Sequence, residues 1–257
     1  MRDRQRKILE MLRRGKIFIK ETAFELGVTE MTLRRDLRAL EERKLLIQIK
    51  GGAISSPIRY ETDTGNRLLN DLKFMIAEAL YKRIMPSETL FIGAGSTALA
   101  FARVLARKKL PALTVVTNAL PVASTLFQSS CKVILLGGEL RTNSLDLVGP
   151  MAERNLEEYH VDWLVSGCDG ALAGNGFYTS DMSLSNLEKR SISIASHVAV
   201  ITESGKFGKK ALTCFASVNA VDLLVTDYGL PAGEAALLKK AGMEVILVRP
   251  PEKGKEG

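Results

Sequence analysis

The sequence is poor in cysteine and histidine, and it contains no uninterrupted apolar run of membrane-spanning length. Its cysteines, Cys131, Cys168 and Cys214, are far apart and odd in number, so neither a disulfide framework nor a zinc-ligand spacing is indicated. We expect buried thiols, no metal and no cofactor. The start, MRDRQRKILEMLRR, alternates charged and apolar residues instead of showing a charged segment followed by a hydrophobic block. A cytoplasmic protein without membrane contact is therefore expected.

The excess of positive charge is confined to one end of the chain. The formal net charge is +7, and residues 1–56 hold 14 Lys and Arg against 8 Asp and Glu, which leaves only +1 for the remaining 201 residues. This asymmetry predicts that a small N-terminal part meets a polyanion while the larger part has another task. Charge alone leaves open whether the polyanion is nucleic acid or anionic lipid.

Apolar residues recur at helical spacing three times in this basic segment. The spacing predicts helices over residues 4–14, 20–26 and 30–43, with a short apolar stretch over 17–19 between the first two. Gly27 stands in a tight turn before the third helix, whose first turn Thr29 can cap through its side-chain oxygen. Two helices joined by such a turn form a helix-turn-helix.

The outer face of the third predicted helix is basic. Leu33, Leu37 and Leu40 form its apolar stripe. Arginine can fork onto guanine or phosphate, and threonine can contact a backbone oxygen or a thymine methyl, so this face can enter a DNA major groove. A solvated amphipathic helix is the alternative. The candidate DNA-binding residues here are Thr29, Met31, Thr32, Arg34, Arg35 and Arg38.

A small hairpin is predicted after these helices. Residues 45–50 are rich in β-formers and end at Gly51-Gly52, which Ala53-Ile54 follows. Such a hairpin adds a wing to the helices. Lys50, Gly51 and Gly52 are its candidate DNA-binding residues, and the alternative for Lys50 is an ordinary exposed lysine.

The N-terminal segment resembles the winged-helix DNA-binding domain of the DeoR-type family of bacterial transcriptional regulators. The resemblance implies DNA binding by Arg34 and Arg35. Thr22 stands where the family usually has an apolar residue, and Gln48 and Lys50 stand at wing positions that are commonly arginine and histidine. The motifs that carry the resemblance are Arg4-Gln5-Arg6 with Ile8-Leu9, Leu26-Gly27-Val28-Thr29, Thr32-Leu33-Arg34-Arg35-Asp36-Leu37, Leu40-Glu41 and Gly51-Gly52-Ala53.

The remainder reads as a linker over residues 57–66, a domain over 67–250 and a polar tail over 251–257. In the large domain β-rich runs alternate with helical segments, which predicts an α/β fold with a mainly parallel, Rossmann-like sheet covered by helices. The expected strands are 89–92, 113–117, 132–136, 163–166, 198–202, 223–226 and 244–248. The expected helices are 66–84, 97–107, 120–128, 151–158, 184–195 and 233–241.

Polar or glycine-rich loops follow five of these strands, at the edge of the sheet where ligands bind. Each loop alone could be a simple turn. Together they include an Asp to accept sugar hydroxyls and a Lys to meet a phosphate, which favours a small phosphorylated polyol as ligand. The candidate ligand-binding residues are Gly93, Gly95, Ser96, Thr97, Thr117, Asn118, Gly138, Asp169, Gly170 and Lys206.

These loops also resemble the effector-binding domain of the DeoR-type family, which is related to ribose-5-phosphate isomerase and binds phosphorylated sugars. The resemblance implies a regulator, a repressor of a carbohydrate operon, whose partners are double-stranded operator DNA, a phosphorylated sugar and further copies of itself in a homodimer or homotetramer. Glu203 replaces a common Asp, and Ser185 replaces a frequent Glu. These departures bear on which ligand is bound.

A sugar-phosphate isomerase with an appended DNA-binding domain is the alternative. Asp169 and Lys206 preserve part of a proton-moving set. The motifs fix no second catalytic carboxylate, and we expect His160 and His197 to be structural and Trp163 to lie in the core. We therefore expect a regulator and not an enzyme.

Overall fold

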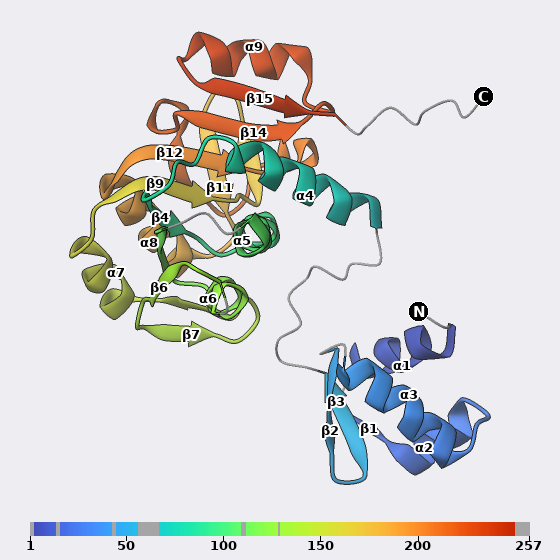
Figure 1. Cartoon of the computed structure of the whole chain (residues 1–257). Coiled ribbons are helices and arrows are strands. Elements are labelled where there is room, and N and C mark those ends of the chain that lie inside the picture. Colours follow the sequence, from blue (N-terminus) through green and yellow to red (C-terminus); the bar gives the residue numbers. More distant parts are fainter. Residues whose placement is uncertain are drawn as a thin grey trace. The chain divides into compact units, whose positions relative to one another are not determined.

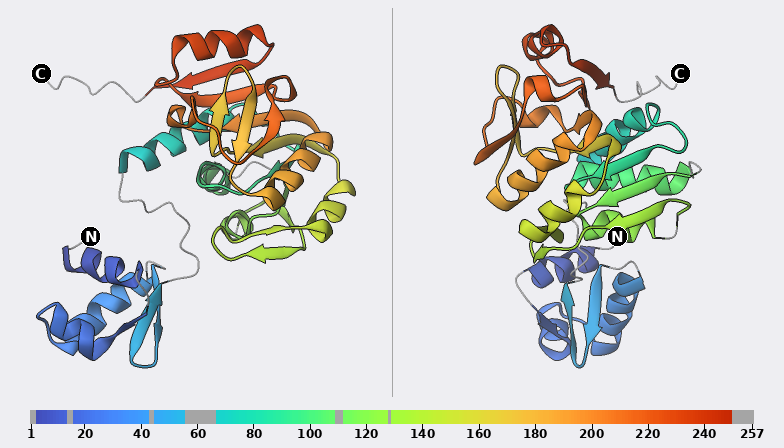
Figure 2. Two further views of the ribbon diagram at one scale, coloured as in Figure 1. Left: turned by 180° about the vertical axis from the view of Figure 1, so that it is seen from behind. Right: turned by 90° about the vertical axis from the view of Figure 1, so that its left-hand side faces the viewer.

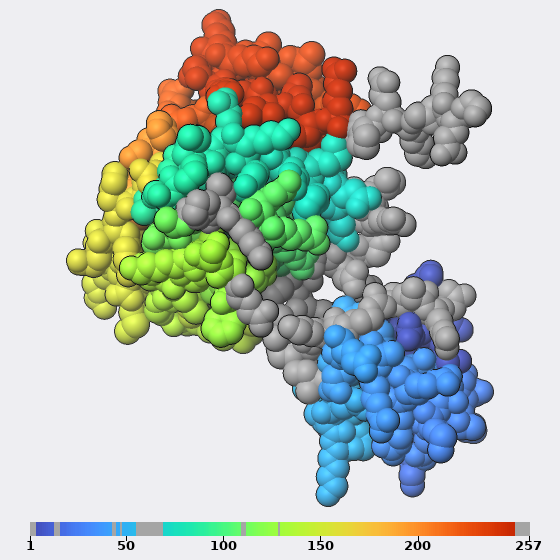
Figure 3. Space-filling view, in the orientation of Figure 1, coloured from blue at the N-terminus to red at the C-terminus, as the bar shows by residue number. Residues whose placement is uncertain are grey.

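The computed structural model describes residues 3–13, 16–42, 45–55, 67–108, 112–127 and 129–249, which form two compact units, Met1–Asp63 and Thr64–Gly257 (Figures 1 and 3). The division between the units falls in the segment expected to be a linker, all of which lies outside the described residues, as does the expected tail.

The N-terminal unit packs three helices against a small antiparallel sheet. Its elements are α1 (Asp3–Arg13), β1 (Ile17–Phe18), α2 (Ile19–Glu25), α3 (Glu30–Glu42), β2 (Leu46–Ile49) and β3 (Gly52–Ser55). The apolar faces of the helices meet in a core that includes Ile8, Leu12, Leu33, Leu37 and Leu40. The helices and the hairpin expected from the sequence are therefore present.

The short apolar stretch after α1 is a strand, which the sequence analysis did not predict. Residues 17–18 form β1 and pair with β3, so the sheet order is β1-β3-β2, with Ile17 opposite Ala53. Helix α2 consequently begins at Ile19 and ends at Glu25, one residue earlier at each end than expected. The strand fastens the wing to the chain that enters the helix-turn-helix.

The large unit is built on a parallel sheet with the order β15-β14-β12-β9-β4-β5-β6 (Figure 1). These strands are β4 (Thr89–Ile92), β5 (Thr114–Thr117), β6 (Lys132–Leu135), β9 (Val161–Ser166), β12 (Ala195–Ile201), β14 (Leu223–Asp227) and β15 (Glu244–Val248). The helices are α4 (Arg67–Tyr81), α5 (Ser96–Lys108), α6 (Leu120–Leu126), α7 (Pro150–Glu157), α8 (Met182–Ser193) and α9 (Ala232–Lys240). The expected α/β fold with a mainly parallel sheet is confirmed.

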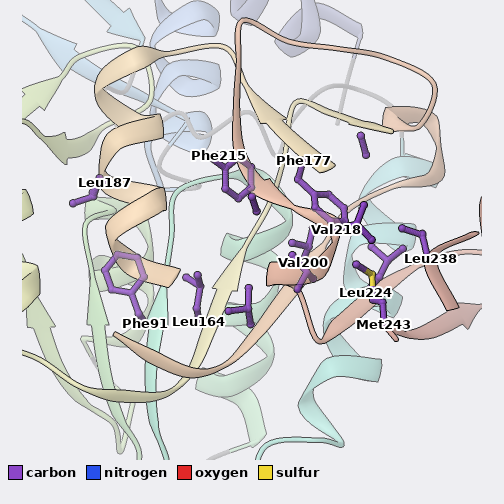
Figure 4. Packing of buried hydrophobic residues seen from close by; sticks show 14 of the residues in the cluster. Phe91, Leu164, Phe177, Leu187, Val200, Phe215, Val218, Leu224, Leu238 and Met243 are labelled. Carbon is purple, nitrogen blue, oxygen red and sulfur yellow. The ribbon is translucent and has the colours of Figure 1, made fainter. Parts of the chain in front are cut away.

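Two buried clusters cover the two faces of this sheet. Leu90 and Ile92 of β4 belong to a cluster formed with α4, α5 and α6. Phe91, between them, belongs to the opposite cluster, which α7, α8 and α9 help to form (Figures 2 and 4). Alternate residues of each strand point to opposite faces, and so a strand buried on both sides is continuously apolar.

Several short antiparallel strands were not predicted. β7 (Glu139–Arg141) and β8 (Asp146–Val148) form a hairpin, and β10 (Gly170–Leu172), β11 (Gly176–Thr179) and β13 (Thr213–Ser217) form a separate three-stranded sheet. The expected element boundaries also shift: α4 ends at Tyr81, α8 begins at Met182 and ends at Ser193, β9 begins at Val161, and β12 begins at Ala195.

The cysteines were expected to be buried, and all three are only partly buried; none forms a disulfide. Trp163 is also only partly buried, and its indole N–H donates a hydrogen bond to Glu88 at 3.4 Å. His197 is exposed and stacks on Trp163, while the exposed His160 pairs with Ser196 Oγ at 3.1 Å. Both histidines thus make local contacts on the surface.

Candidate functional site

Helix α3 presents the basic face that the sequence predicts. Its buried residues are Leu33, Asp36, Leu37 and Leu40, and Met31 is 81% exposed on the other side. The Thr32 backbone N–H donates to Thr29 Oγ1 at 3.2 Å, so Thr29 caps the helix as expected. Gly27 in the preceding turn has φ +63°, a conformation that glycine adopts without strain.

The three candidate arginines of α3 differ in their surroundings. Arg34, Arg35 and Arg38 are exposed, and Arg34 forms an i,i+4 ion pair with Glu30 at 3.6 Å. Asp36, between them in the sequence, points inward and forms an ion pair with Arg4 of α1 at 2.5 Å. The helix thus directs its arginines outward, while its one aspartate fastens α1 to α3.

The wing is joined to α3 through Gln48. Its backbone N–H and its side-chain Nε2 both donate to the Glu41 carboxylate at 2.7 Å, and these bonds lower the pKa of Glu41. Lys50 and Gly51 are exposed at the tip of the hairpin. Gly52 is buried, and a Cβ there would lie 2.0 Å from the Ile17 carbonyl oxygen, so close packing within the unit accounts for this glycine.

The candidate effector site lies at the carboxyl-terminal edge of the large sheet. β4 has β5 on one side and β9 on the other, and the chain runs from β4 to β5 to β6 before it returns to β9. The strand order therefore reverses between β4 and β9, and ligands of open α/β sheets bind at such a switch point. The loops that start at Gly93 and Gly167 flank it, and the Gly93 N–H donates to the Val165 carbonyl at 2.9 Å.

Two of these loops can receive an anion. Gly95 precedes α5 with φ +133°, and Ser96 and Thr97 open this helix, whose first-turn N–H groups are available to a negatively charged group. Lys206 lies in the short 3-10 turn η2 (Ser204–Lys206) after β12. Asp227 holds this turn by accepting hydrogen bonds from the N–H and the hydroxyl of Ser204, both at 2.7 Å.

Asn118 and Asp169 add polar groups at the same edge. Asn118 donates through Nδ2 to the Leu147 carbonyl at 3.2 Å, while its buried Oδ1 has no hydrogen-bond partner within the described part of the chain. Asp169 is exposed after β9 and accepts a hydrogen bond from the Ser180 N–H at 2.8 Å. Both side chains therefore retain acceptor capacity.

Three candidates have structural explanations instead. The Thr117 hydroxyl donates to the Ile92 carbonyl at 2.6 Å, which joins β5 to β4. A Cβ at Gly138 would lie 2.7 Å from the Val148 carbonyl oxygen, and one at Gly170 would lie 2.5 Å from that of Lys209. Backbone packing thus accounts for both glycines.

The models of two family domains match the chain. The DeoR C terminal sensor domain matches residues 70–228, and the DeoR-like helix-turn-helix domain matches residues 4–58. The chain belongs to the DeoR family. It is thus a DNA-binding transcriptional regulator with a sensor domain, as the resemblance implied.

Known proteins align along nearly all of this DeoR-family chain. The HTH-type transcriptional regulator YulB of Bacillus subtilis is 32% identical over 253 residues, which cover 96% of each chain. An Escherichia coli O157:H7 protein with the provisional name of aga operon transcriptional repressor is 28% identical over 96% of this chain and 93% of its own. Ribose 5-phosphate isomerase A from Methanocaldococcus jannaschii matches 53% of this chain and 54% of its own at 19% identity, with a TM-score of 0.40.

The structure of this DeoR-family protein adds a residue that the sequence analysis missed. Glu188 of α8 is only 7% exposed, and its Oε1 accepts a hydrogen bond from the hydroxyl of Ser166, at the end of β9, at 3.3 Å. Its burial depends on how α8 packs on the sheet. The Leu187-Glu188-Lys189 sequence contains no motif that would have indicated it.

The β7–β8 hairpin brings a second missed residue, Arg141. It forms ion pairs with Asp146 of β8 at 2.6 Å and with Asp181 at 3.0 Å, and Asp181 in turn caps α8 by accepting from the Leu184 N–H at 2.9 Å. The side chain of Ser185, next in α8, is buried and lies 3.3 Å from the Thr213 hydroxyl. Arg141 therefore fixes the start of the helix that carries Glu188.

Helix α4 reaches the Lys206 loop through an ion pair. Lys73 Nζ lies 3.2 Å from Glu203 Oε1, and the two side chains are only 11% and 14% exposed. Glu203 directly precedes the η2 turn. The acidic residue at this position thus has a partner on the first helix of the sensor unit.

In the described ranges, no group of three His, Cys, Asp or Glu side chains could hold a metal ion. Nor does any helix of those ranges have the length and apolar character needed to cross a membrane.

Proposed function

We propose that this protein is a repressor of a carbohydrate-utilisation operon and that a phosphorylated sugar relieves its binding to operator DNA. The observation that carries the proposal is that groups suited to an anion and groups suited to hydroxyls follow four neighbouring strands, β12, β9, β4 and β5, at the carboxyl-terminal edge of the sheet. The α5 N-terminus and Lys206 suit a phosphate, while Asn118 and Asp169 suit hydroxyl groups. The provisional name of the Escherichia coli relative supports the repressor role.

For the DNA, we propose contacts by Thr29, Met31, Thr32, Arg34, Arg35 and Arg38 of the helix-turn-helix and by Lys50 and Gly51 of the wing. All but Thr32 and Gly51 have exposed side chains, and Thr32 is partly exposed. Two copies of the chain would place two α3 helices on repeated or palindromic half-sites separated by about one helical turn or a multiple of it. A homodimer or homotetramer is therefore part of the proposal.

Footprinting or gel shift on the promoter beside the gene tests the DNA-binding role. We expect sequence-preferring, salt-sensitive binding, and Arg35→Ala should weaken it by about 5- to 150-fold, the range of about 1–3 kcal/mol for a base-reading arginine. Arg154→Ala, which removes an exposed arginine of α7, is the matched control and should bind as the parent does. If Arg35→Ala bound the operator as tightly as the parent does, the assignment of α3 as the DNA-contacting helix would be wrong.

A thermal-shift screen of phosphorylated sugars tests the effector. A ligand should raise the melting temperature of the parent and of Lys240→Ala, a control at an exposed lysine of α9, and should have no effect on Lys206→Ala. The same sugar should then lower operator affinity, since it can shift the protein only by binding one state better than the other. A uniformly flat screen would contradict the effector proposal.

One observation favours the isomerase alternative: Glu188 lies near Asp169 and is a candidate for the second catalytic carboxyl group. We nevertheless propose that the protein binds sugar phosphates without converting them, since the relatives that align along the whole chain are named as regulators. A steady-state isomerase assay with aldose and ketose phosphates separates the two. Turnover that is lost in Glu188→Gln would favour the enzyme.

A further inference from the structure

Glu188 has an unusual environment for a carboxyl group. Ser166 donates to Oε1, while Oε2 is buried and lacks a hydrogen-bond partner among the residues that the structure describes. Buried polar atoms are nearly always paired, because an unpaired one gives up its hydrogen bonds to water without replacement. An atom that remains unpaired beside a candidate ligand site is therefore a candidate for contact with that ligand.

The position of Glu188 places its carboxyl group at the switch point. Ser166 is the last residue of β9, and a Cβ added to Gly93, the first residue after β4, would lie 3.6 Å from the same Ser166 hydroxyl. Glu188 therefore reaches the two central strands from α8, on the side of the sheet opposite α5. The neighbouring residues Leu187 and Ser191 are buried and hold the helix in place.

The charges around Glu188 favour its neutral form. Burial raises its pKa to about 8, and the negative charges of Asp169, after β9, and Asp146, on β8, act in the same direction. Arg141 opposes them, but it is already paired with Asp146 and Asp181. Cys168 also lies near and stays protonated, because burial raises its pKa to about 12. At neutral pH the carboxyl thus holds a proton that it can donate.

We propose that Glu188 donates a hydrogen bond from Oε2 to an uncharged oxygen of the effector, and so selects sugar phosphates whose far end is a carbonyl or hydroxyl over those that end in a carboxylate. A ligand carboxylate at this place would meet the charge of Asp169. The phosphate would bind elsewhere, at the α5 N-terminus and Lys206. This inference rests on the proposed sugar-phosphate effector and narrows its chemical class.

The test uses the full chain and matched pairs of probes, namely aldose phosphates of four to six carbons and the aldonic acid phosphates that differ from them only at C1. The variants are Glu188→Gln, which keeps an N–H donor of nearly the same shape, Glu188→Ala, which removes the donor, and Lys206→Ala. Binding is measured by calorimetry from pH 7 to 9.5. Carbon-13 NMR of labelled glutamate carboxyl groups, with Glu188→Gln to assign the signal, follows the titration of Glu188 with and without probe.

We expect the Glu188 carboxyl to titrate near pH 8 in the free protein and at higher pH with a bound aldose phosphate. The affinity of the parent for that probe should fall about tenfold per pH unit above the midpoint, whereas the affinity of Glu188→Gln should stay constant. Each aldonic acid phosphate should bind at least about tenfold more weakly than its partner. Glu188→Ala should bind the aldose phosphate more weakly than the parent at pH 7, with an affinity that does not depend on pH.

The outcomes separate this inference from the proposed function. If sugar phosphates bind through Lys206 but Glu188→Gln and Glu188→Ala both match the parent at every pH, only the role of Glu188 is overturned. A free-protein midpoint near 4.5, or tighter binding of the aldonic acid phosphates, overturns it too. If no probe binds any form of the protein, both the effector proposal and the role of Glu188 are overturned.

Discussion

Among single residues, Glu188 has a consequence for stability that needs no ligand. Its pKa is raised to about 8 in the folded protein from an ordinary value of 4.5. As the pH rises between these values, the unfolded chain releases a proton that the folded chain retains, so the free energy of unfolding falls, and the loss is complete above about pH 8.

Glu188→Gln should therefore be more stable than the parent at alkaline pH. Each pKa unit corresponds to about 1.4 kcal/mol, and 1 kcal/mol moves Tm by about 2–4 °C in a chain of this size, so we expect a gain of several degrees at pH 8.5 that vanishes near pH 4.5. Thermal unfolding across this range measures it. Glu158→Gln, at an exposed glutamate, should follow the parent throughout, and parallel curves for Glu188→Gln and the parent would refute the raised pKa.

The residues that sequence reasoning found and missed differ in how local their interactions are. Thr29 caps a helix three residues away, and Gly27 has the backbone conformation that its place in a turn requires, so short patterns predict both. The hydrogen bond between Glu188 and Ser166 joins residues 22 apart in sequence. No sequence pattern near either residue predicts this hydrogen bond, because it follows from how α8 packs on the sheet.

At the scale of elements, the pairing of β1 with β3 leaves no room for a side chain at Gly52. Gly52→Ala should disrupt their pairing, because its Cβ would lie 2.0 Å from the Ile17 carbonyl oxygen. We expect faster amide hydrogen exchange over residues 17–55 of the full chain and weaker operator binding. Gly51→Asn is the control for hydrogen exchange, since asparagine tolerates the positive φ of +81° at this exposed turn. Similar amide exchange rates in the two variants would show that the sheet can accommodate a Cβ at residue 52.

The ion pair that joins α4 to the Lys206 loop should contribute measurably to stability. Lys73→Met leaves the Glu203 carboxylate shielded and unpaired, so we expect a loss of about 1–3 kcal/mol in the free energy of unfolding, which adding Glu203→Gln partly restores. Chemical denaturation of the single and double variants measures the coupling. Lys108→Met breaks the more exposed pair with Glu78 and should cost less than about 1 kcal/mol. Equal losses for the two lysines would argue against a special role for Lys73.

The elements that the sequence predicted correctly are those with strong periodicity. Short runs of β-formers place all seven strands of the parallel sheet within a few residues, and helical spacing does the same for its helices. The strands β7, β8 and β10 have three residues each, which is too short for a pattern. The pairing of β11 with β13 crosses the whole of α8 and β12, so only the assembled fold reveals it.

At the scale of the whole molecule, the division into two units allows DNA binding and sensing to be separated. A fragment of residues 64–257 should bind the sugar phosphate identified in the screen but not operator DNA. A fragment of residues 1–63 should bind operator DNA with lower affinity, because it lacks the oligomerisation proposed for the larger unit, and sugar phosphate should not affect it. Calorimetry and footprinting on the two fragments measure this, and a sugar response in the small fragment would contradict it.

The local contacts of the N-terminal unit allow it to fold before the large unit during synthesis. The contacts of the N-terminal unit are local: the Arg4–Asp36 pair, for example, joins residues 32 apart. In the large unit, β4 can pair with β9 only after β9 has been synthesised: the Thr89 N–H, for example, donates a hydrogen bond to the carboxylate of Asp162, 73 residues later. Local contacts form faster, and domains fold as units from the N-terminus as they leave the ribosome. A nascent chain would thus carry a folded DNA-binding unit, with β1 already paired to β3 of the wing, before the sensor unit has folded.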